Sequence, residues 1–465
     1  MKPLKYNRGF RGSLISILTN RLQKGIIVLM QFRSTKSKFP LVSYKDAVLN
    51  CLPDDGGLYV PDQTADIRKL LFSMNEKTTF NDMLSAVAPN ILEGGINPAS
   101  ASKIAASAFN YEPELISLDE NYSLLKLYNG PTGIFKDYGI AFLSAILEEF
   151  MKGRERSMIV SAARADTAVS MAHAFNGRKG ISLVLLYPSG QIRGLDPSSF
   201  VQNGGNIIPI QVKGTFDDCQ RLVVETIKDR KFSSRYNVTS SNTINPGRLL
   251  PQVFYYLYAF IQIKNKFSKD LFFSVPCGNF GNLIAGLYAW KFGMPVNGFI
   301  AAMNINNAFG DYIRGNKFRP KPLVTTKSPS LDVSVPLNYE RLASFYEEAP
   351  AVMRNMVYPA SIKDDLTMQT IEQFFKKYGI YVDSNTAVAF AAAQAIAAEY
   401  KLNGHAHIVV LATGHPAREA SLAGDAVGQS IKVPESIQAL KKRCDPIAII
   451  QPQLDAVESA IASCF

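Results

Sequence analysis

The amino-acid sequence predicts an α/β fold in which parallel sheets are flanked by helices, with a smaller N-terminal domain in front. From residue 120 onward, short apolar and β-branched runs alternate with longer amphipathic stretches. Continuously apolar strands followed by helices are typical of parallel sheets that are covered on both faces. The predicted strands are SMIV (157–160), ISLVLLYP (181–188), NIIPIQV (206–212), LFFSVP (271–276), VNGFIAAMN (296–304) and HIVVLATG (407–414).

The first part of the chain departs from this pattern. Several helical stretches surround a glycine-rich turn, PDDGGLYVP, so we expect an N-terminal domain over 30–118 and a main α/β domain over 119–465. Residues 1–29 form a basic extension with six basic residues and no acid. This extension indicates either a transit peptide or a start site assigned too early, and it contributes nothing to the fold prediction.

The net charge of +11 is partly concentrated in that extension. No predicted helix or strand gathers Lys and Arg together with aromatic residues, so we expect no nucleic-acid partner. No apolar run is long and uninterrupted enough to span a bilayer, so we expect no membrane partner and a soluble protein. We predict a cytoplasmic location, or an organellar one if residues 1–29 are a transit peptide, and a monomer or homodimer.

Cysteine and histidine spacing argues against a disulfide framework and against a zinc site. The cysteines are odd in number, far apart and without C-x-x-C spacing, which favours a reducing compartment. Only His405 and His407 lie close together, and a strand edge explains them better than a metal site. We therefore predict no metal. The cysteines are Cys51, Cys219, Cys277, Cys444 and Cys464.

The stretch GPTGIFKDYG (130–139) places Lys136 between a glycine-proline turn and an apolar helical run. The N-terminal end of a helix disfavours an ammonium, because the helix dipole is positive there. The same position favours a free amine or an imine. A solvated surface lysine is the alternative interpretation.

The stretch SVPCGNFGN (274–282) follows a predicted strand and opens a predicted helix. Gly278 and Gly281 allow close backbone approach, and the first amides of the helix offer unpaired donors, which together suit a phosphate group. An ordinary tight turn explains the same glycines. No Walker loop and no G-x-G-x-x-G follows any predicted strand.

Together a lysine and a phosphate cradle suggest pyridoxal 5′-phosphate (PLP), which needs an amine, a phosphate cup and a partner for its ring nitrogen. Thr413, at the end of the strand HIVVLAT, is a candidate for the third role. Its hydroxyl would leave the ring nitrogen uncharged, which suits elimination and replacement chemistry. A helix cap is the alternative role for Thr413.

Several longer strings resemble the threonine synthase family, in the same order along the chain. They are VSYKDAVLNCLPDDGGLYVP, GPTGIFKDYG, GTFDDCQRLV, TSSNTINPGRLLPQ, VPCGNFGN and ATGHPAR. The resemblance covers nearly the whole chain from Met30. It implies a PLP-dependent lyase with a tryptophan-synthase-β-like fold, whose PLP-binding catalytic domain is 119–465. The implied reaction converts O-phosphohomoserine, a phosphorylated amino acid, and water into L-threonine and phosphate.

The resemblance also implies roles for individual residues. Lys136 would form the Schiff base with the cofactor and then shuttle protons, Thr413 would face the ring nitrogen, and Asn245 and Arg248 would face the substrate phosphate. An arginine fork suits a phosphate because it donates at two points. The cofactor phosphate would rest on Gly278, Asn279, Phe280, Gly281 and Asn282.

The substrate side departs from the family pattern. The family's S-G-D-T-G is RADTA here, with Arg164, Asp166 and Thr167 as the candidate carboxylate-binding residues. Two alanines in this loop would crowd it if the backbone needs positive φ, whereas an arginine would itself hold a carboxylate. The other departures are Ala165, Ala168, Ser189, Gln191, Asn129 and Asn385.

These departures leave three alternatives to a threonine synthase. The first is a phospho-lyase that releases a keto acid and ammonia, the second is an enzyme with another amino-acid substrate, and the third is a non-catalytic relative that binds PLP.

Overall fold

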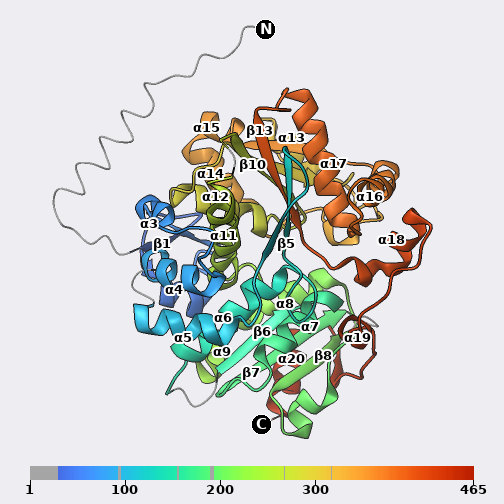
Figure 1. The fold of residues 1–465 in the computed structure, drawn as a ribbon. Coiled ribbons are helices and arrows are strands. Elements are labelled where there is room, and N and C mark those ends of the chain that lie inside the picture. Colours follow the sequence, from blue (N-terminus) through green and yellow to red (C-terminus); the bar gives the residue numbers. More distant parts are fainter. Residues whose placement is uncertain are drawn as a thin grey trace, which may run out of the picture.

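The computed structural model describes residues 30–92, 96–153, 157–188, 193–266, 268–315 and 317–464. Its strands form one small sheet and two larger ones, which are surrounded by helices (Figure 1). Within these residues, no helix is both long and apolar enough to cross a membrane.

The N-terminal part combines a small antiparallel sheet with four helices. The strand order is β2-β1-β3, and Phe32 of β1 is fully buried under this sheet. Ser43 and Thr79 begin α2 and α4, because each hydroxyl accepts a backbone N–H of the first helical turn. The elements are β1 (Gln31–Ser34), β2 (Val42–Ser43), α2 (Tyr44–Asn50), β3 (Tyr59–Pro61), α3 (Arg68–Ser73), α4 (Phe80–Ile91) and α5 (Pro98–Ala108).

The largest sheet has six strands in the order β12-β11-β10-β13-β5-β4. All neighbours are parallel except β4, which runs antiparallel to β5. The strands are β4 (Glu114–Ser117), β5 (Tyr122–Lys126), β10 (Asp270–Pro276), β11 (Gly298–Met303), β12 (Val357–Ser361) and β13 (Ala406–Ala412).

Helices cover both faces of this sheet, as its continuously apolar strands require. Phe272 packs into the cluster on the side of α16 and α17, while its neighbour Phe273 packs on the side of α11 and α12 (Figure 1). The helices of this region are α11 (Val253–Ile263), α12 (Gly281–Lys291), α13 (Ala308–Ile313), α14 (Tyr339–Glu348), α15 (Pro350–Arg354), α16 (Asp364–Tyr378), α17 (Ser384–Glu399) and α18 (Ala420–Val427).

The third sheet has five parallel strands in the order β14-β8-β7-β6-β9. Ile159 of β6 packs into the core shared with α6 and α7, whereas Val160 packs toward α8 and α20. The strands are β6 (Ser157–Ala162), β7 (Ile181–Pro188), β8 (Ile207–Val212), β9 (Val238–Thr239) and β14 (Ala448–Ile450).

The other described helices lie between or beside these sheets in the chain. They are α6 (Lys136–Phe150), α7 (Ala165–Phe175), α8 (Phe216–Lys228), α9 (Arg230–Tyr236), α10 (Pro246–Leu249), α19 (Glu435–Ala439) and α20 (Leu454–Ala462). Short 3₁₀ turns complete the chain at η1 (Pro197–Ser199), η2 (Val201–Asn203), η3 (Leu250–Gln252), η4 (Pro329–Leu331) and η5 (Pro416–Glu419).

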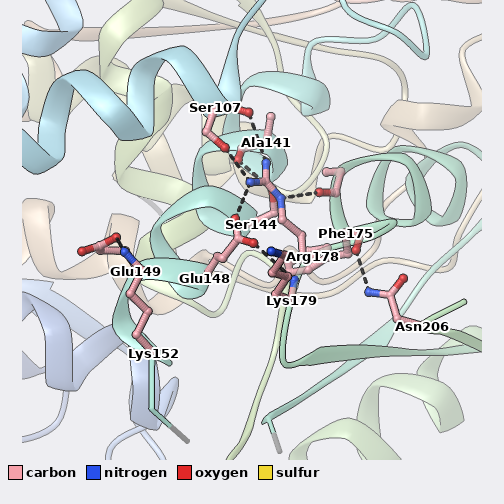
Figure 2. A network of polar contacts seen from close by, with 11 residues as sticks. Ser107, Ala141, Ser144, Glu148, Glu149, Lys152, Phe175, Arg178, Lys179 and Asn206 are labelled. Carbon is pink, nitrogen blue, oxygen red and sulfur yellow. Dashed lines mark hydrogen bonds and ion pairs between the residues drawn. The ribbon is translucent and has the colours of Figure 1, made fainter.

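An arginine network ties α5, α6 and the end of α7 together (Figure 2). The Arg178 guanidinium donates to Ser107 Oγ at 2.6 Å and to Glu148 Oε2 at 2.8 Å. Its Nε also donates to the Ala174 carbonyl at 3.2 Å, which satisfies one of the last carbonyls of α7. This network lies at the C-terminal ends of α6 and α7.

The predicted α/β class is confirmed, and each predicted strand is present. The sequence did not separate these strands into two sheets, since nothing in an apolar run states which strand it will pair with. The division of the chain at residue 118 stays a prediction. Strand β4 ends just before residue 118, yet it is hydrogen-bonded to β5 of the six-stranded sheet and not to the small sheet.

Candidate active site

Lys136 is the first residue of α6 and follows a loop that leaves the carboxyl end of β5. The neighbouring Asp137 carboxylate holds this loop, because it accepts the Thr132 N–H at 2.9 Å, the Thr132 hydroxyl at 2.6 Å and the Ser170 hydroxyl at 2.6 Å. Burial raises the pKa of Asp137, while these three donors lower it. The loop geometry in front of Lys136 is therefore fixed from the side of α7.

The end of β13 lies directly beside this lysine loop. The Phe135 N–H donates to the Thr413 carbonyl at 2.9 Å, and the His415 N–H donates to the Gly133 carbonyl at 2.9 Å. Thr413 is 6% exposed, and no side chain or backbone group among the described residues pairs with its hydroxyl. The structure thus brings Thr413 next to Lys136 with its hydroxyl available.

The Lys136 side chain is partly buried, and its Nζ donates to Thr167 Oγ1 at 3.1 Å. Burial, the largest cause, lowers the pKa of Lys136 to about 8. Asp166 opposes this shift, whereas the positive charges of Arg248, Arg418 and Arg164 reinforce it. The helix N-terminus predicted the right direction, but removal from water is the larger cause.

The loop RADTA enters α7, with Arg164 at the N-cap position and the next four residues in the first helical turn. Ala168 lies within α7 and is fully buried. Its backbone is helical and does not have a positive φ, so the helix accommodates its methyl group. The predicted crowding of the backbone therefore does not arise at Ala168. The Ala165 side chain lies outside the described residues.

The three candidate substrate residues of this loop point in different directions. Thr167 meets Lys136, as described above. Asp166 forms an ion pair with Arg418 of η5. The exposed Arg164 guanidinium lies over the Phe216 ring, 4.6 Å from its centroid, which is a cation–π contact.

Residues 278–282 follow β10, run into the first turn of α12 and form a backbone cradle. A Cβ on Gly278 would come within 2.7 Å of the Ser330 carbonyl, so only glycine fits there without a shift. Phe280 has φ +60°, a left-handed conformation that is unusual for a bulky residue and is found at ligand clamps. No acceptor in the described part of the chain takes the backbone N–H of residues 278 to 282.

Side chains around the cradle hold its shape. Asn282 Nδ2 donates to the Pro276 carbonyl at 2.8 Å, and Asn279 Oδ1 accepts the Leu337 N–H at 3.2 Å. Asn338 Nδ2 donates to the Asn279 carbonyl at 3.0 Å. Five free amides at the start of α12 suit an anion such as a phosphate.

Arg248 is 5% exposed and lies on α10. Its guanidinium makes one hydrogen bond, donating to the Ser241 carbonyl at 2.5 Å, and no carboxylate in the described ranges lies within ion-pair distance. Burial lowers its pKa to about 10. A buried cation without a counterion suits an anionic ligand.

Asn245 is the N-cap residue of α10, the helix that carries Arg248, and its role at the substrate phosphate stays a prediction. Its side chain is fully buried, and its Nδ2 donates to the Val48 carbonyl at 2.9 Å, the Ser240 carbonyl at 2.9 Å and Thr239 Oγ1 at 3.2 Å. Its Oδ1 accepts the Gly247 N–H at 2.8 Å and so caps α10. These bonds occupy both ends of the amide and place Asn245 as a support of the loop.

The other departures from the family pattern lie in different surroundings. Asn129 is exposed and donates to the Glu112 carbonyl at 3.2 Å. Asn385 is buried, its Nδ2 donates to Asp383 Oδ2 at 2.9 Å, and its Oδ1 has no partner among the described residues. Ser189 and Gln191 lie outside the described residues.

Two residues that the sequence did not single out support this site. Arg418 belongs to the string ATGHPAR, and it donates to the Thr132 carbonyl of the lysine loop. Asn338 is fully buried and joins the cradle to Thr243 Oγ1 at 3.2 Å. The string could have pointed to Arg418, whereas no sequence signal marks Asn338, because its partners are far away in the chain.

The residues present fit PLP. The Lys136 amine, the Thr413 hydroxyl and the amide cradle follow the carboxyl ends of β5, β13 and β10, which are consecutive strands of one sheet. Ligands in open parallel sheets bind at this edge.

Comparisons with known proteins agree with this fit. The family model "Pyridoxal-phosphate dependent enzyme" matches residues 118–414, and the model "Threonine synthase N terminus" matches residues 31–109. The threonine synthase of Escherichia coli strain K12 is 30% identical over 88% of this chain and 94% of that protein. The threonine synthase of Buchnera aphidicola from Schizaphis graminum shows the same identity and coverage.

Solved structures are similar over the same length. The crystal structure of threonine synthase from Escherichia coli has a TM-score of 0.83 and 28% identity, covering 93% of this chain and all of that one. The PLP-bound threonine synthase from Brucella melitensis has a TM-score of 0.82 and 27% identity, covering 94% and 99%. This chain therefore belongs to the threonine synthase family of pyridoxal-phosphate-dependent enzymes.

Proposed function

We propose that this enzyme is a PLP-dependent lyase that converts O-phosphohomoserine and water into L-threonine and phosphate. The observation that carries the proposal is Lys136, an amine whose pKa is lowered to about 8 and whose Nζ lies 3.1 Å from Thr167 Oγ1. A base that works near neutral pH needs a pKa in this range.

On this proposal Lys136, Thr413 and residues 278–282 hold the cofactor. Lys136 would supply the amine for the aldehyde, Thr413 the hydroxyl for the ring nitrogen, and the backbone amides of residues 278–282 the donors for the phosphate. Bound PLP supplies an electron sink that stabilises negative charge on the carbon atoms of the substrate.

Arg248 would hold the substrate phosphate. Its guanidinium is buried and makes one hydrogen bond to the described part of the chain, so it has donors left for two phosphate oxygens. Asn245 supports this role indirectly, because it fixes the start of the short helix that carries Arg248.

The start of α7 would hold the substrate carboxylate. Backbone N–H groups at a helix N-terminus attract anions, and the Thr167 hydroxyl lies within reach of both the carboxylate site and Lys136. We assign Arg164 and Asp166 to the rim of this site. Asp166 acts through its ion pair with Arg418.

Lys136 would move the protons of the reaction. Its uncharged amine would take a proton from the substrate and return one to it as phosphate leaves and water adds. The hydroxyl of Thr167 orients this amine, and burial keeps a fraction of it uncharged at neutral pH.

A phospho-lyase that releases a keto acid and ammonia is the second candidate. It is favoured by one observation, that the family's serine is here Arg164, whose guanidinium lies over Phe216. An altered carboxylate site changes how the substrate is held and hence which atom receives water.

The test is a product assay on the PLP-loaded protein with O-phosphohomoserine. We expect threonine and phosphate in equal amounts, and no threonine from Lys136→Ala, whose visible cofactor absorbance is also lost. Phosphate with keto acid and ammonia but without threonine would establish the lyase instead. The monomer or homodimer and the cytoplasmic location stay predictions.

A further inference from the structure

Arg418 joins loops that belong to two different sheets. It lies in η5, directly after β13 of the six-stranded sheet. One end of its guanidinium donates to the Thr132 carbonyl in the lysine loop, and the other pairs with Asp166 at the start of α7, which follows β6 of the five-stranded sheet. Its side chain is only 14% exposed.

Both members of this ion pair affect the pKa of Lys136. Among the charged groups that face Lys136, Asp166 is the one that favours its ammonium, while Arg418, Arg248 and Arg164 disfavour it. An Asp166 carboxylate without a partner would attract the ammonium more strongly and would be free to draw it away from Thr167. Arg418 neutralises this carboxylate and anchors the loop that precedes Lys136.

We propose that Arg418 is a positioning residue, which holds Asp166 and the lysine loop together across the two sheets and thereby keeps the Lys136 amine on Thr167. The inference rests on the proposed role of Lys136. It assigns Arg418 no contact with the substrate or the cofactor.

The test measures how fast full-length protein stripped of PLP regains visible cofactor absorbance at different pH values. Capture requires the uncharged amine of Lys136, so the rate rises through the pKa of this group. In Arg418→Gln a positive charge is lost and Asp166 is released, and both changes favour the ammonium. We expect the pH of half-maximal rate to rise by about half a unit or more.

Conservative and remote variants sharpen this test. Arg418→Lys keeps the positive charge, so its half-maximal pH should stay near that of the wild type while the rate falls. Arg178→Gln is the matched control, because Arg178 is also a mostly buried arginine with a carboxylate partner, Glu148, and a carbonyl partner, but it lies at the far end of α6 and α7 (Figure 2). It should leave the half-maximal pH unchanged.

Repeating the measurement in two variant proteins separates the possible causes of a shift in the half-maximal pH. If Arg418 acts through Asp166, then Arg418→Gln should shift the midpoint less in Asp166→Asn protein than in the wild type. Glu419 is adjacent, and burial together with Asp383 raises its pKa to about 7, so the series is repeated with Glu419→Gln. The pH dependence of kcat/KM for the PLP-loaded enzyme gives a second measurement of this half-maximal pH.

The outcomes distinguish this inference from the proposed function. Equal midpoints for wild type and Arg418→Gln, or an equal shift in Arg178→Gln, would overturn the role of Arg418. Retention of the absorbance in Lys136→Ala would instead overturn the role of Lys136. If Arg418→Gln does not fold, an unchanged capture rate in Arg418→Lys refutes the inference.

Discussion

Replacing Arg248 by methionine should stabilise the unliganded protein and at the same time weaken its hold on a phosphorylated substrate. Burial lowers the pKa of Arg248 from its usual 12.5 to about 10, which corresponds to about 3 kcal/mol against the charged form. Methionine removes this cost but leaves the Ser241 carbonyl without its donor, a loss of about 1 kcal/mol. We expect a net gain of about 1–2 kcal/mol in the free energy of unfolding.

The loss of binding should be larger than this gain. A hydrogen-bonded charge pair that loses one partner costs about 2–5 kcal/mol, so kcat/KM for the phosphorylated substrate should fall about a hundredfold or more. The visible absorbance of bound PLP should not change, because Arg248 is not among the residues that we assign to the cofactor.

Arg341 provides a matched control. It is also buried with a pKa lowered to about 10, but its guanidinium donates to the carbonyls of Tyr59, Thr243 and Ile244 and to Asn338 Oδ1. Arg341→Met removes the same cost of about 3 kcal/mol but leaves four acceptors unpaired at about 1 kcal/mol or more each, so it should destabilise the protein by about 1 kcal/mol or more. The two substitutions should therefore change the free energy of unfolding in opposite directions, although the two arginines are similarly buried.

The assay is thermal unfolding of PLP-loaded protein with and without inorganic phosphate, together with steady-state kinetics. Phosphate should raise the Tm of the wild type, since a ligand that binds the folded state stabilises it, and should not raise that of Arg248→Met. The reasoning is refuted if Arg248→Met lowers the Tm as Arg341→Met does. It is also refuted if phosphate raises the Tm of the wild type and of Arg248→Met equally.

Three further substitutions test the cradle and the altered loop. Gly278→Ala puts a methyl group about 2.7 Å from the Ser330 carbonyl, so the cradle must move, and we expect PLP affinity in an absorbance titration to fall about tenfold or more. Asn338→Asp removes the donor to the Asn279 carbonyl and adds a negative charge near the cradle, so PLP should dissociate faster on dilution; an unchanged rate would contradict the assigned role. Ala168→Gly should not improve kcat/KM and should cost about 1 kcal/mol in denaturant unfolding, because Ala168 is helical and buried. A gain in activity would show that the loop needs a conformation other than this helix.

The sequence indicated those parts of the site that are local in the chain. The lysine at a helix start, the glycines after β10 and the threonine after β13 are each placed by a strand and a helix that are visible in the hydrophobic pattern. The donors of the cradle in particular are its own backbone amides. The parallel sheets follow from the same apolar runs.

The partners of those residues could not be predicted in this way. Asn338 meets Asn279 across 59 positions, and Asn245 meets Val48 across 197 positions. A motif states which residue types occur together but not whether an amide is already satisfied by carbonyls from another helix. For this reason the motif alone assigns Asn245 to the substrate, whereas the structure shows its amide bonded to Val48, Thr239, Ser240 and Gly247.

The contact between Val48 and Asn245 has a consequence for how the two matched regions, 31–109 and 118–414, depend on each other. The carbonyl of Val48, in the last turn of α2, receives both Asn245 Nδ2 and the Thr239 hydroxyl. A segment that contributes no reactive group thus helps to fix the start of α10, the helix that carries Arg248. We therefore expect that exchanging α2 between relatives would alter the affinity for a phosphorylated substrate and would leave vitamin B6 attachment intact.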